Sequence, residues 1–182
     1  MSLSCSDGNG LTFPDEKILK IVEKYIETGL IPLKELDDEK MLTLDFFKLA
    51  VPLESINGSL AWKHRNFGSE MEIPYIVRFY FKNNRNWRKA ILEYFKAIGE
   101  QDPEEFVRIF GEVVENAKGL LICCEDLVDI AMKHGKEPGA LISELKGSGL
   151  ISPIVGCGVF GKSKAPLYEI NRFFAILLKI EE

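Results

Sequence analysis

The sequence contains few of the residues and motifs on which catalytic and metal sites are commonly built. Histidine occurs only twice, as His64 and His134. The four cysteines, which form no CxxC pair and no familiar zinc spacing, are Cys5, Cys123, Cys124 and Cys157. There is no HExxH zinc helix and no GxSxG nucleophile turn. Gly156–Ser163 has the spacing GxxxxGK[S/T], but Pro166 follows it where a phosphate loop would need the start of a helix. We therefore expect no catalytic residues, no cofactor and no metal, and a protein that is not an enzyme.

Long apolar runs and a strong excess of charge are also missing. The longest apolar runs, Gly119–Cys124 and Phe173–Leu178, are far shorter than the about 20 residues that span a bilayer, so we expect no membrane segment. The N-terminus lacks the basic and apolar regions of a secretory signal, which predicts a cytoplasmic location. A net charge of −5 argues against indiscriminate binding of nucleic acid, and a hydrophobic content of 46% is typical of a soluble globular protein.

The N-terminal half predicts helices that follow a polar tail. Residues 1–12 are polar and glycine-rich, which predicts a disordered tail. Residues 13–100 predict a mostly helical domain, with one helix over Phe13–Gly29 and another over Met41–Ala50. Ile73–Phe81 fits a helix or a strand, because its β-branched and aromatic content favours a strand while its lack of strict alternation does not.

Basic charge gathers in residues 60–98, where lysine and arginine are interspersed with aromatic residues. We expect Arg85, Arg88 and Lys89 to share one helix with an apolar stripe that contains Trp87. Cations for phosphates and rings for stacking are typical of a nucleic-acid surface. The alternative is an amphipathic helix with a solvated basic face, and the sequence leaves both interpretations open.

Residues 101–182 predict a second unit with its own order of elements. Asp102-Pro103 is a strong helix start, because aspartate caps free amides and proline suits the first turn. The expected elements are a helix over Asp102–Ala117, a strand over Leu120–Cys123, helices over Glu125–His134 and Glu137–Lys146, and strands over Ile151–Val155 and Leu167–Ile170. Three glycines separate the last two strands, and Pro166 follows them where a phosphate-binding turn would need a helix, so they predict a loose hairpin tip.

This order of helices and strands resembles the winged helix-turn-helix family over residues 102–172. The phrase LISELKGSGLI followed by PLYEINR is similar to the end of a recognition helix and the two strands of a wing. The expected fold class is therefore mainly α with a small β-hairpin (α+β): a helical N-terminal domain followed by a winged helix-turn-helix domain. The resemblance implies binding through the second helix of the turn and the wing, usually to duplex DNA and less often to proteins.

The resemblance also implies a set of DNA contacts. On or beside the second helix these are Lys136, Ser143, Lys146 and Ser148, and at the wing tip they are Lys162, Ser163 and Lys164. The first interpretation is a DNA-binding transcriptional regulator whose footprint is extended by the three basic residues of the central helix. The second is a protein-interaction or scaffolding module without nucleic acid. Glu137 and Glu144 on the second helix, which would repel phosphates, favour the second interpretation, as does the balanced charge of residues 116–182.

The C-terminal tail and the adjacent cysteines complete the expectations. Phe173–Ile180 is almost entirely apolar and must be covered, either by the N-terminal domain or by a second copy of the chain. The second case predicts a homodimer through this tail. Cys123 and Cys124 are expected to be small core residues of a buried strand.

Overall fold

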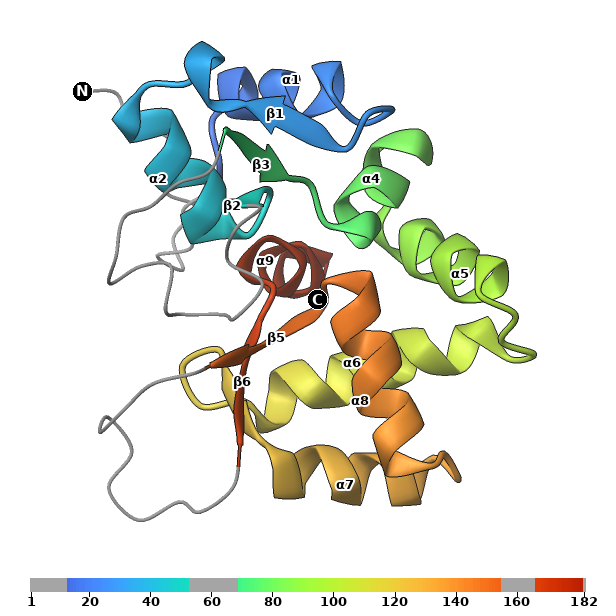
Figure 1. Ribbon diagram of the computed structural model, residues 1–182. Helices are drawn as coiled ribbons and strands as arrows, with labels where there is room; N and C mark the ends of the chain where they lie inside the picture. Colours follow the sequence, from blue (N-terminus) through green and yellow to red (C-terminus); the bar gives the residue numbers. More distant parts are fainter. Residues whose placement is uncertain (1–12, 53–68, 155–165, 182) are drawn as a thin grey trace.

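The computed structural model describes residues 13–52, 69–154 and 166–181 of the chain. The described part is mainly helical with two small antiparallel sheets, which confirms the expected α+β class (Figure 1). None of its helices is both long and apolar enough to cross a bilayer. The predicted disordered tail and the proposed wing-tip contacts Lys162, Ser163 and Lys164 lie outside the described residues.

The N-terminal part combines helices with a small sheet. Its elements are α1 (Glu16–Lys24), β1 (Leu30–Pro32), the 3-10 helix η1 (Leu33–Glu35), α2 (Asp38–Phe47), β2 (Val51–Pro52), β3 (Glu70–Glu72), α4 (Tyr75–Lys82) and α5 (Trp87–Ala97). The strands β1 and β2 pair antiparallel with β3 between them, a sheet that the sequence analysis did not predict. These strands have only two or three residues each, too few for an alternating pattern to be visible.

The ambiguous segment Ile73–Phe81 is mostly helix. Pro74 precedes the first turn of α4, and the buried side chains Ile76, Val77, Tyr80 and Phe81 follow helical spacing. The β-branched and aromatic residues that favoured a strand are the apolar face of this helix. Packing of that face against the core outweighs the local strand preference.

The C-terminal part follows the expected order of elements. They are α6 (Pro103–Asn116), β4 (Leu121–Cys123), α7 (Cys124–Lys133), α8 (Pro138–Ser148), β5 (Ile151–Ile154), β6 (Leu167–Ile170) and α9 (Arg172–Glu181). The sheet has the strand order β4-β6-β5, with both neighbours antiparallel to β6. At the start of α6 the side chain of Asp102 accepts a hydrogen bond from the amide of Glu105, and proline occupies the first turn as expected.

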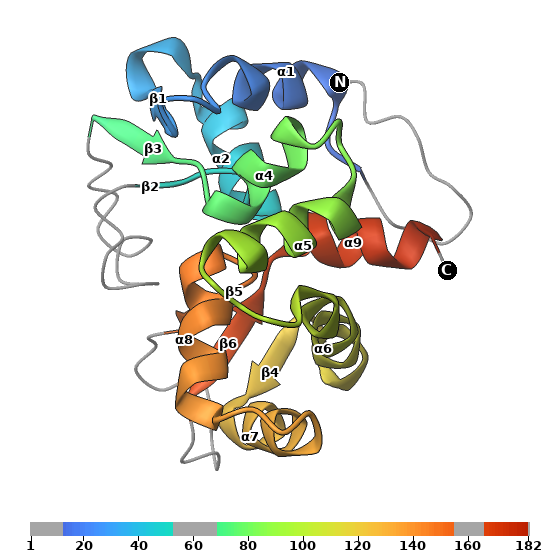
Figure 2. The same ribbon diagram turned by 90° about the vertical axis from the view of Figure 1, so that its right-hand side faces the viewer.

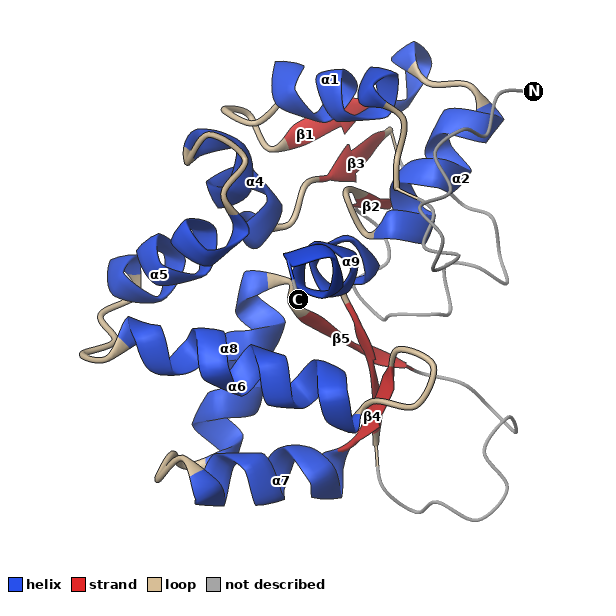
Figure 3. Ribbon diagram, turned by 180° about the vertical axis from the view of Figure 1, so that it is seen from behind, coloured by secondary structure: helices blue, strands red, loops and turns tan. Residues whose placement is uncertain are grey.

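The apolar core is continuous across the boundary that we expected near residue 100. That boundary falls in the turn between α5 and α6, yet the rings of Phe95 and Phe106 stack across it with centroids 3.7 Å apart. Helix α9 lies between the two parts of the molecule (Figure 3), and its residues Phe173 and Phe174 are fully buried. Most of the apolar tail is therefore covered by its own chain, in contact with α2 and α5, while Ile180 near its end is exposed.

A buried asparagine ties three segments together where the two parts meet. The side-chain amide of Asn171 donates to the carbonyl oxygens of Lys48, 3.2 Å away, and Gly149, 3.0 Å away. Its side-chain oxygen accepts from the amide of Phe174 and so caps the start of α9. Because Lys48 ends α2 and Gly149 ends α8, this contact attaches the C-terminal end of α8 to the N-terminal part of the chain.

Candidate nucleic-acid interface

Helix α8 lies along one side of the molecule, below α4 and α5 (Figure 2). Its inner face carries Leu141, Leu145 and Ser148, which are buried against the core. Its exposed positions are mostly small residues: Gly139, Ala140, Ser143, Lys146 and Gly147. Two of the proposed DNA contacts, Ser143 and Lys146, therefore point away from the core.

The N-terminus of α8 already has an anionic partner. The carboxylate of Glu137 accepts hydrogen bonds from the amides of Gly139, at 3.0 Å, and Ala140, at 2.5 Å. These bonds lower the pKa of Glu137, which keeps the carboxylate charged. Since free helix amides are the usual place for a phosphate, Glu137 occupies the position that a DNA backbone would otherwise take.

Lys136 is turned toward α5 and α6 rather than toward solvent. Its ammonium group lies 2.5 Å from the carboxylate of Glu100 and 4.6 Å from the ring centre of Phe106. Nearby, burial and the neighbouring Glu100 raise the pKa of Glu144 on α8. The expectation that Lys136 is directed at a phosphate is therefore not supported, because Glu100 in the turn between α5 and α6 pairs with it.

Ser148 is fully buried, which contradicts its proposed role as a DNA contact. Its hydroxyl donates to the carbonyl oxygen of Leu145 at 2.8 Å and accepts from the amide of Leu150 at 3.1 Å. Both bonds secure the last turn of α8. The position was misjudged because α8 extends to Ser148, two residues beyond its expected end at Lys146, and helical spacing from Leu141 and Leu145 places the serine on the inner face.

Arg85 does not belong to the helix in which it was expected. It lies in the turn before α5 with φ of 59°, and its guanidinium contacts Glu16 at 2.9 Å and Glu23 at 3.0 Å. Arg88 and Lys89 are exposed in the first turn of α5, where the Arg88 guanidinium lies over the ring of Trp87.

The turn between α4 and α5 is on the opposite side of the molecule from α8 (Figure 2). The basic residues next to this turn and the outward face of α8 consequently do not form one surface. The sequence alone could not show that these two sets of residues lie apart. Their separation depends on the packing of α4 against α5, which places the turn beside α1.

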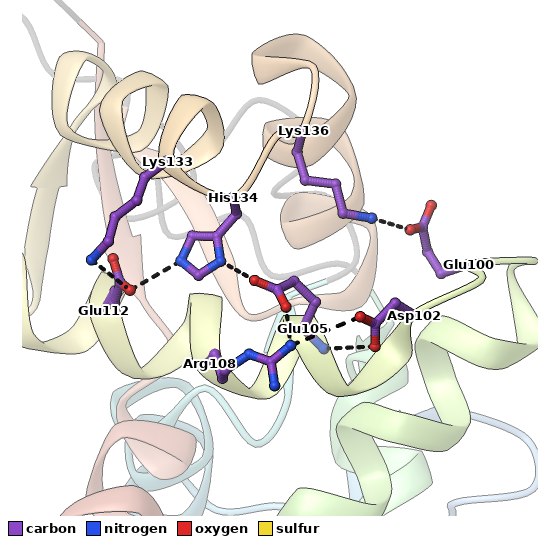
Figure 4. Close-up of polar contacts among 8 residues, drawn as sticks. All are labelled: Glu100, Asp102, Glu105, Arg108, Glu112, Lys133, His134 and Lys136. Carbon is purple, nitrogen blue, oxygen red and sulfur yellow. Dashed lines mark hydrogen bonds and ion pairs between the residues drawn. The ribbon is translucent and has the colours of Figure 1, made fainter.

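A cluster of charged residues fastens the turn between α7 and α8 to α6 (Figure 4). The ring nitrogens of His134 contact Glu105 and Glu112, and Lys133 lies 2.9 Å from the same Glu112 carboxylate oxygen. Arg108 and then His134 lower the pKa of Glu105, and Lys133 and His134 lower that of Glu112. We call these groups, together with Lys136 and Glu100, the turn cluster.

The sequence analysis treated His134 only as a cation at a helix end. It does end α7, as expected, but its main partners are on another helix. The spacing of Glu105 and Glu112 places them on one face of α6, and this was the available signal. This spacing alone did not predict the contact with His134, because the sequence does not show that this face of α6 meets the turn after α7.

Both adjacent cysteines are partly buried, and Cys124 packs against the core as expected, although it begins α7 instead of belonging to the strand. The thiol of Cys123 donates to a carboxylate oxygen of Asp126 at 2.9 Å, and burial followed by this carboxylate raises the pKa of the thiol. A raised pKa disfavours the reactive thiolate. Within the described residues no group of three histidine, cysteine or acidic side chains is placed to hold a metal ion.

A protein-family model matches residues 10–181, so the chain belongs to this family over almost its entire length. No curated protein and no solved structure matches.

Proposed function

We propose that residues 103–170 form a winged helix-turn-helix module. The order α6, β4, α7, α8, β5, β6 supports the proposal, as does the three-stranded sheet in which β4 joins the hairpin of β5 and β6. In such a module α7 and α8 are the two helices of the turn, and α8 is the helix that would enter a major groove.

On this basis we propose that the protein binds duplex DNA through α8 and the wing and acts as a transcriptional regulator. The observation that carries the proposal is the outward face of α8, where small residues allow a close approach and Ser143 and Lys146 offer polar groups. Lys146 would contact a phosphate or a guanine edge, and Ser143 a phosphate or a base. Lys162, Ser163 and Lys164 stay in the proposed footprint as wing-tip contacts. A regulator of this kind requires a compartment that holds DNA, which agrees with the expected cytoplasmic location.

The proposed footprint is smaller than the one expected from the sequence. Ser148 is buried, Lys136 is engaged by Glu100, and Arg85 is engaged by α1. Arg88 and Lys89 belong to the first turn of α5, directly after the α4–α5 turn that lies away from α8 (Figure 2). We therefore propose a contact limited to α8 and the wing.

A second candidate function is docking of a protein partner on the same face of α8. The specific observation in its favour is the carboxylate of Glu137 at the helix N-terminus, which repels a phosphate. A surface made mainly of glycine, alanine and serine would accommodate a helix or strand of a partner at short distance. This candidate predicts no affinity for DNA even at low salt.

Binding to a fluorescently labelled random duplex, measured by anisotropy at several salt concentrations, separates the two candidates. A DNA-binding module loses affinity steeply with salt, by a log-log slope of about one unit for each phosphate contact. Lys146→Ala should weaken binding and reduce the slope by about one unit, and Lys162→Ala with Lys164→Ala by up to about two.

The matched control for Lys146 is Lys34→Ala, which removes the same charge from an exposed lysine in η1, far from α8. It should leave affinity and slope unchanged. Absence of binding at the lowest salt, or an equal effect of the Lys34 and Lys146 substitutions, would refute DNA binding through α8. The first result would leave docking of a protein partner as the working proposal.

A further inference from the structure

His134 is placed between two carboxylates, and its side chain is only 8% exposed. Its Nδ1 atom contacts a carboxylate oxygen of Glu105, and its Nε2 atom lies 3.0 Å from one of Glu112. A neutral imidazole has a single N–H and can donate to only one of these oxygens. The second nitrogen would then direct its lone pair at a carboxylate. The arrangement is therefore complete only when the ring carries both protons.

The other charged groups around the ring keep their charges near neutral pH, so the contact depends on the protonation of His134. Arg108 on α6 pairs with Glu105, and Lys133 on α7 pairs with Glu112. The pKa of each glutamate is lowered, so both carboxylates stay charged near neutral pH. Further along the turn Lys136 faces Glu100 of the α5–α6 connection. Among these types of group, histidine is the one that ordinarily changes its charge between about pH 5 and 8.

The ring is attached to the segment that positions α8. His134 ends α7, and only three residues separate it from Pro138, the first residue of α8. Helix α6 on the other side of the contact is anchored by buried residues such as Phe106 and Phe110. A change in the contact would therefore move the turn and the start of α8 rather than α6.

We propose that His134 is a pH-sensitive latch that holds the α7–α8 turn on α6 when its ring carries both protons and releases the turn when the ring is neutral. Loss of one ring proton places a lone pair against a carboxylate, so that this contact no longer holds the turn as the lysine contacts to Glu112 and Glu100 do. The consequence for DNA, a start of α8 that is ordered at low pH and mobile at high pH, rests on the proposed function. The latch itself does not.

Hydrogen exchange of single amides, measured by NMR over a range of pH, tests the latch. The amide of Lys136 donates to the carbonyl oxygen of Ala131 across the turn and reports its opening, and the amide of Phe110 within α6 is the reference. Because the chain has two histidines, His64→Gln leaves one imidazole, whose protonation is followed in the same samples. The protection of Lys136 relative to Phe110 should fall by about tenfold as the ring loses its proton, since hydrogen bonds to charged groups are the stronger class.

Adding His134→Gln to the His64→Gln protein should abolish this pH dependence, because the glutamine side chain cannot gain or lose a proton in this range. If that variant does not fold, Glu112→Gln serves instead: its side-chain N–H can donate to the neutral ring, so the fall should become much smaller. A constant protection ratio across the titration of the ring, or an undiminished fall in either variant, would overturn the latch.

Affinity for the random duplex, measured in the same buffers, separates the latch from the proposed function. A pH-dependent turn in a protein that binds no DNA supports the latch and contradicts the proposed function. A DNA-binding protein with a turn that does not respond to the ring contradicts the latch alone.

Discussion

Replacing Gly149 by alanine tests how the end of α8 meets the N-terminal part of the chain. Gly149 has φ of +86°, a left-handed conformation that costs an alanine about 1–2 kcal/mol. A Cβ atom added there would also lie 2.5 Å from Cβ of Pro74, at the start of α4. Relieving such overpacking by a backbone shift costs a further 1–3 kcal/mol or so, about 2–5 kcal/mol in total.

Gly119→Ala is the matched control, because Gly119 has φ of +63° but no atom within 4 Å of an added Cβ. It should lose only the conformational part, about 1–2 kcal/mol. Both variants are compared by urea unfolding followed by far-UV circular dichroism. A double-mutant cycle with Pro74→Gly, which removes the clashing atom, should restore about 1–3 kcal/mol to Gly149→Ala.

The reasoning is refuted if Gly149→Ala and Gly119→Ala lose the same free energy of unfolding, or if Pro74→Gly restores nothing. Either result would mean that the C-terminal end of α8 does not rest on the chain before α4. The two parts of the molecule would then not be coupled through Gly149 and Pro74.

Three further predictions concern polar groups. The free energy of unfolding should decline as the pH falls below about 4.3, the ordinary pKa of glutamate. Folding lowers the pKa of Glu105 and Glu112, so these carboxylates stabilise the folded protein above that pH and lose this contribution as they are protonated. Thermal unfolding of Glu105→Gln should show a weaker decline. Asn171→Ala should cost about 2–4 kcal/mol, since it leaves two carbonyl oxygens without donors and removes a helix cap. Ser148→Ala should cost about 1 kcal/mol in urea unfolding and leave any DNA affinity unchanged.

Each of these has an outcome that contradicts it. An equally steep acid decline in Glu105→Gln would mean that the turn cluster contributes nothing to acid stability. A neutral Asn171→Ala would mean that the junction is solvated, and a loss of DNA affinity in a stable Ser148→Ala protein would mean that this hydroxyl is accessible after all.

Local pattern was enough to predict most of the elements. The helix start at Asp102-Pro103, the two short helices before Gly149 and the paired strands that follow all appear close to their expected bounds. Capping residues, prolines and apolar periodicity act within a few residues, so the sequence carries this information directly. Ile73–Phe81 could not be decided in the same way, because its residue types and its spacing favour different structures and packing made the choice.

What the sequence determined by itself is the class of fold, the order of elements in the C-terminal part and the set of candidate residues. The tertiary structure decided which candidates are available, because charges far apart in the chain meet only after folding. Arg85 found Glu16 and Glu23, Lys136 found Glu100, and His134 found two glutamates of α6. A cation is a candidate contact only while no closer carboxylate holds it, and the distance to that carboxylate is set by how the helices pack.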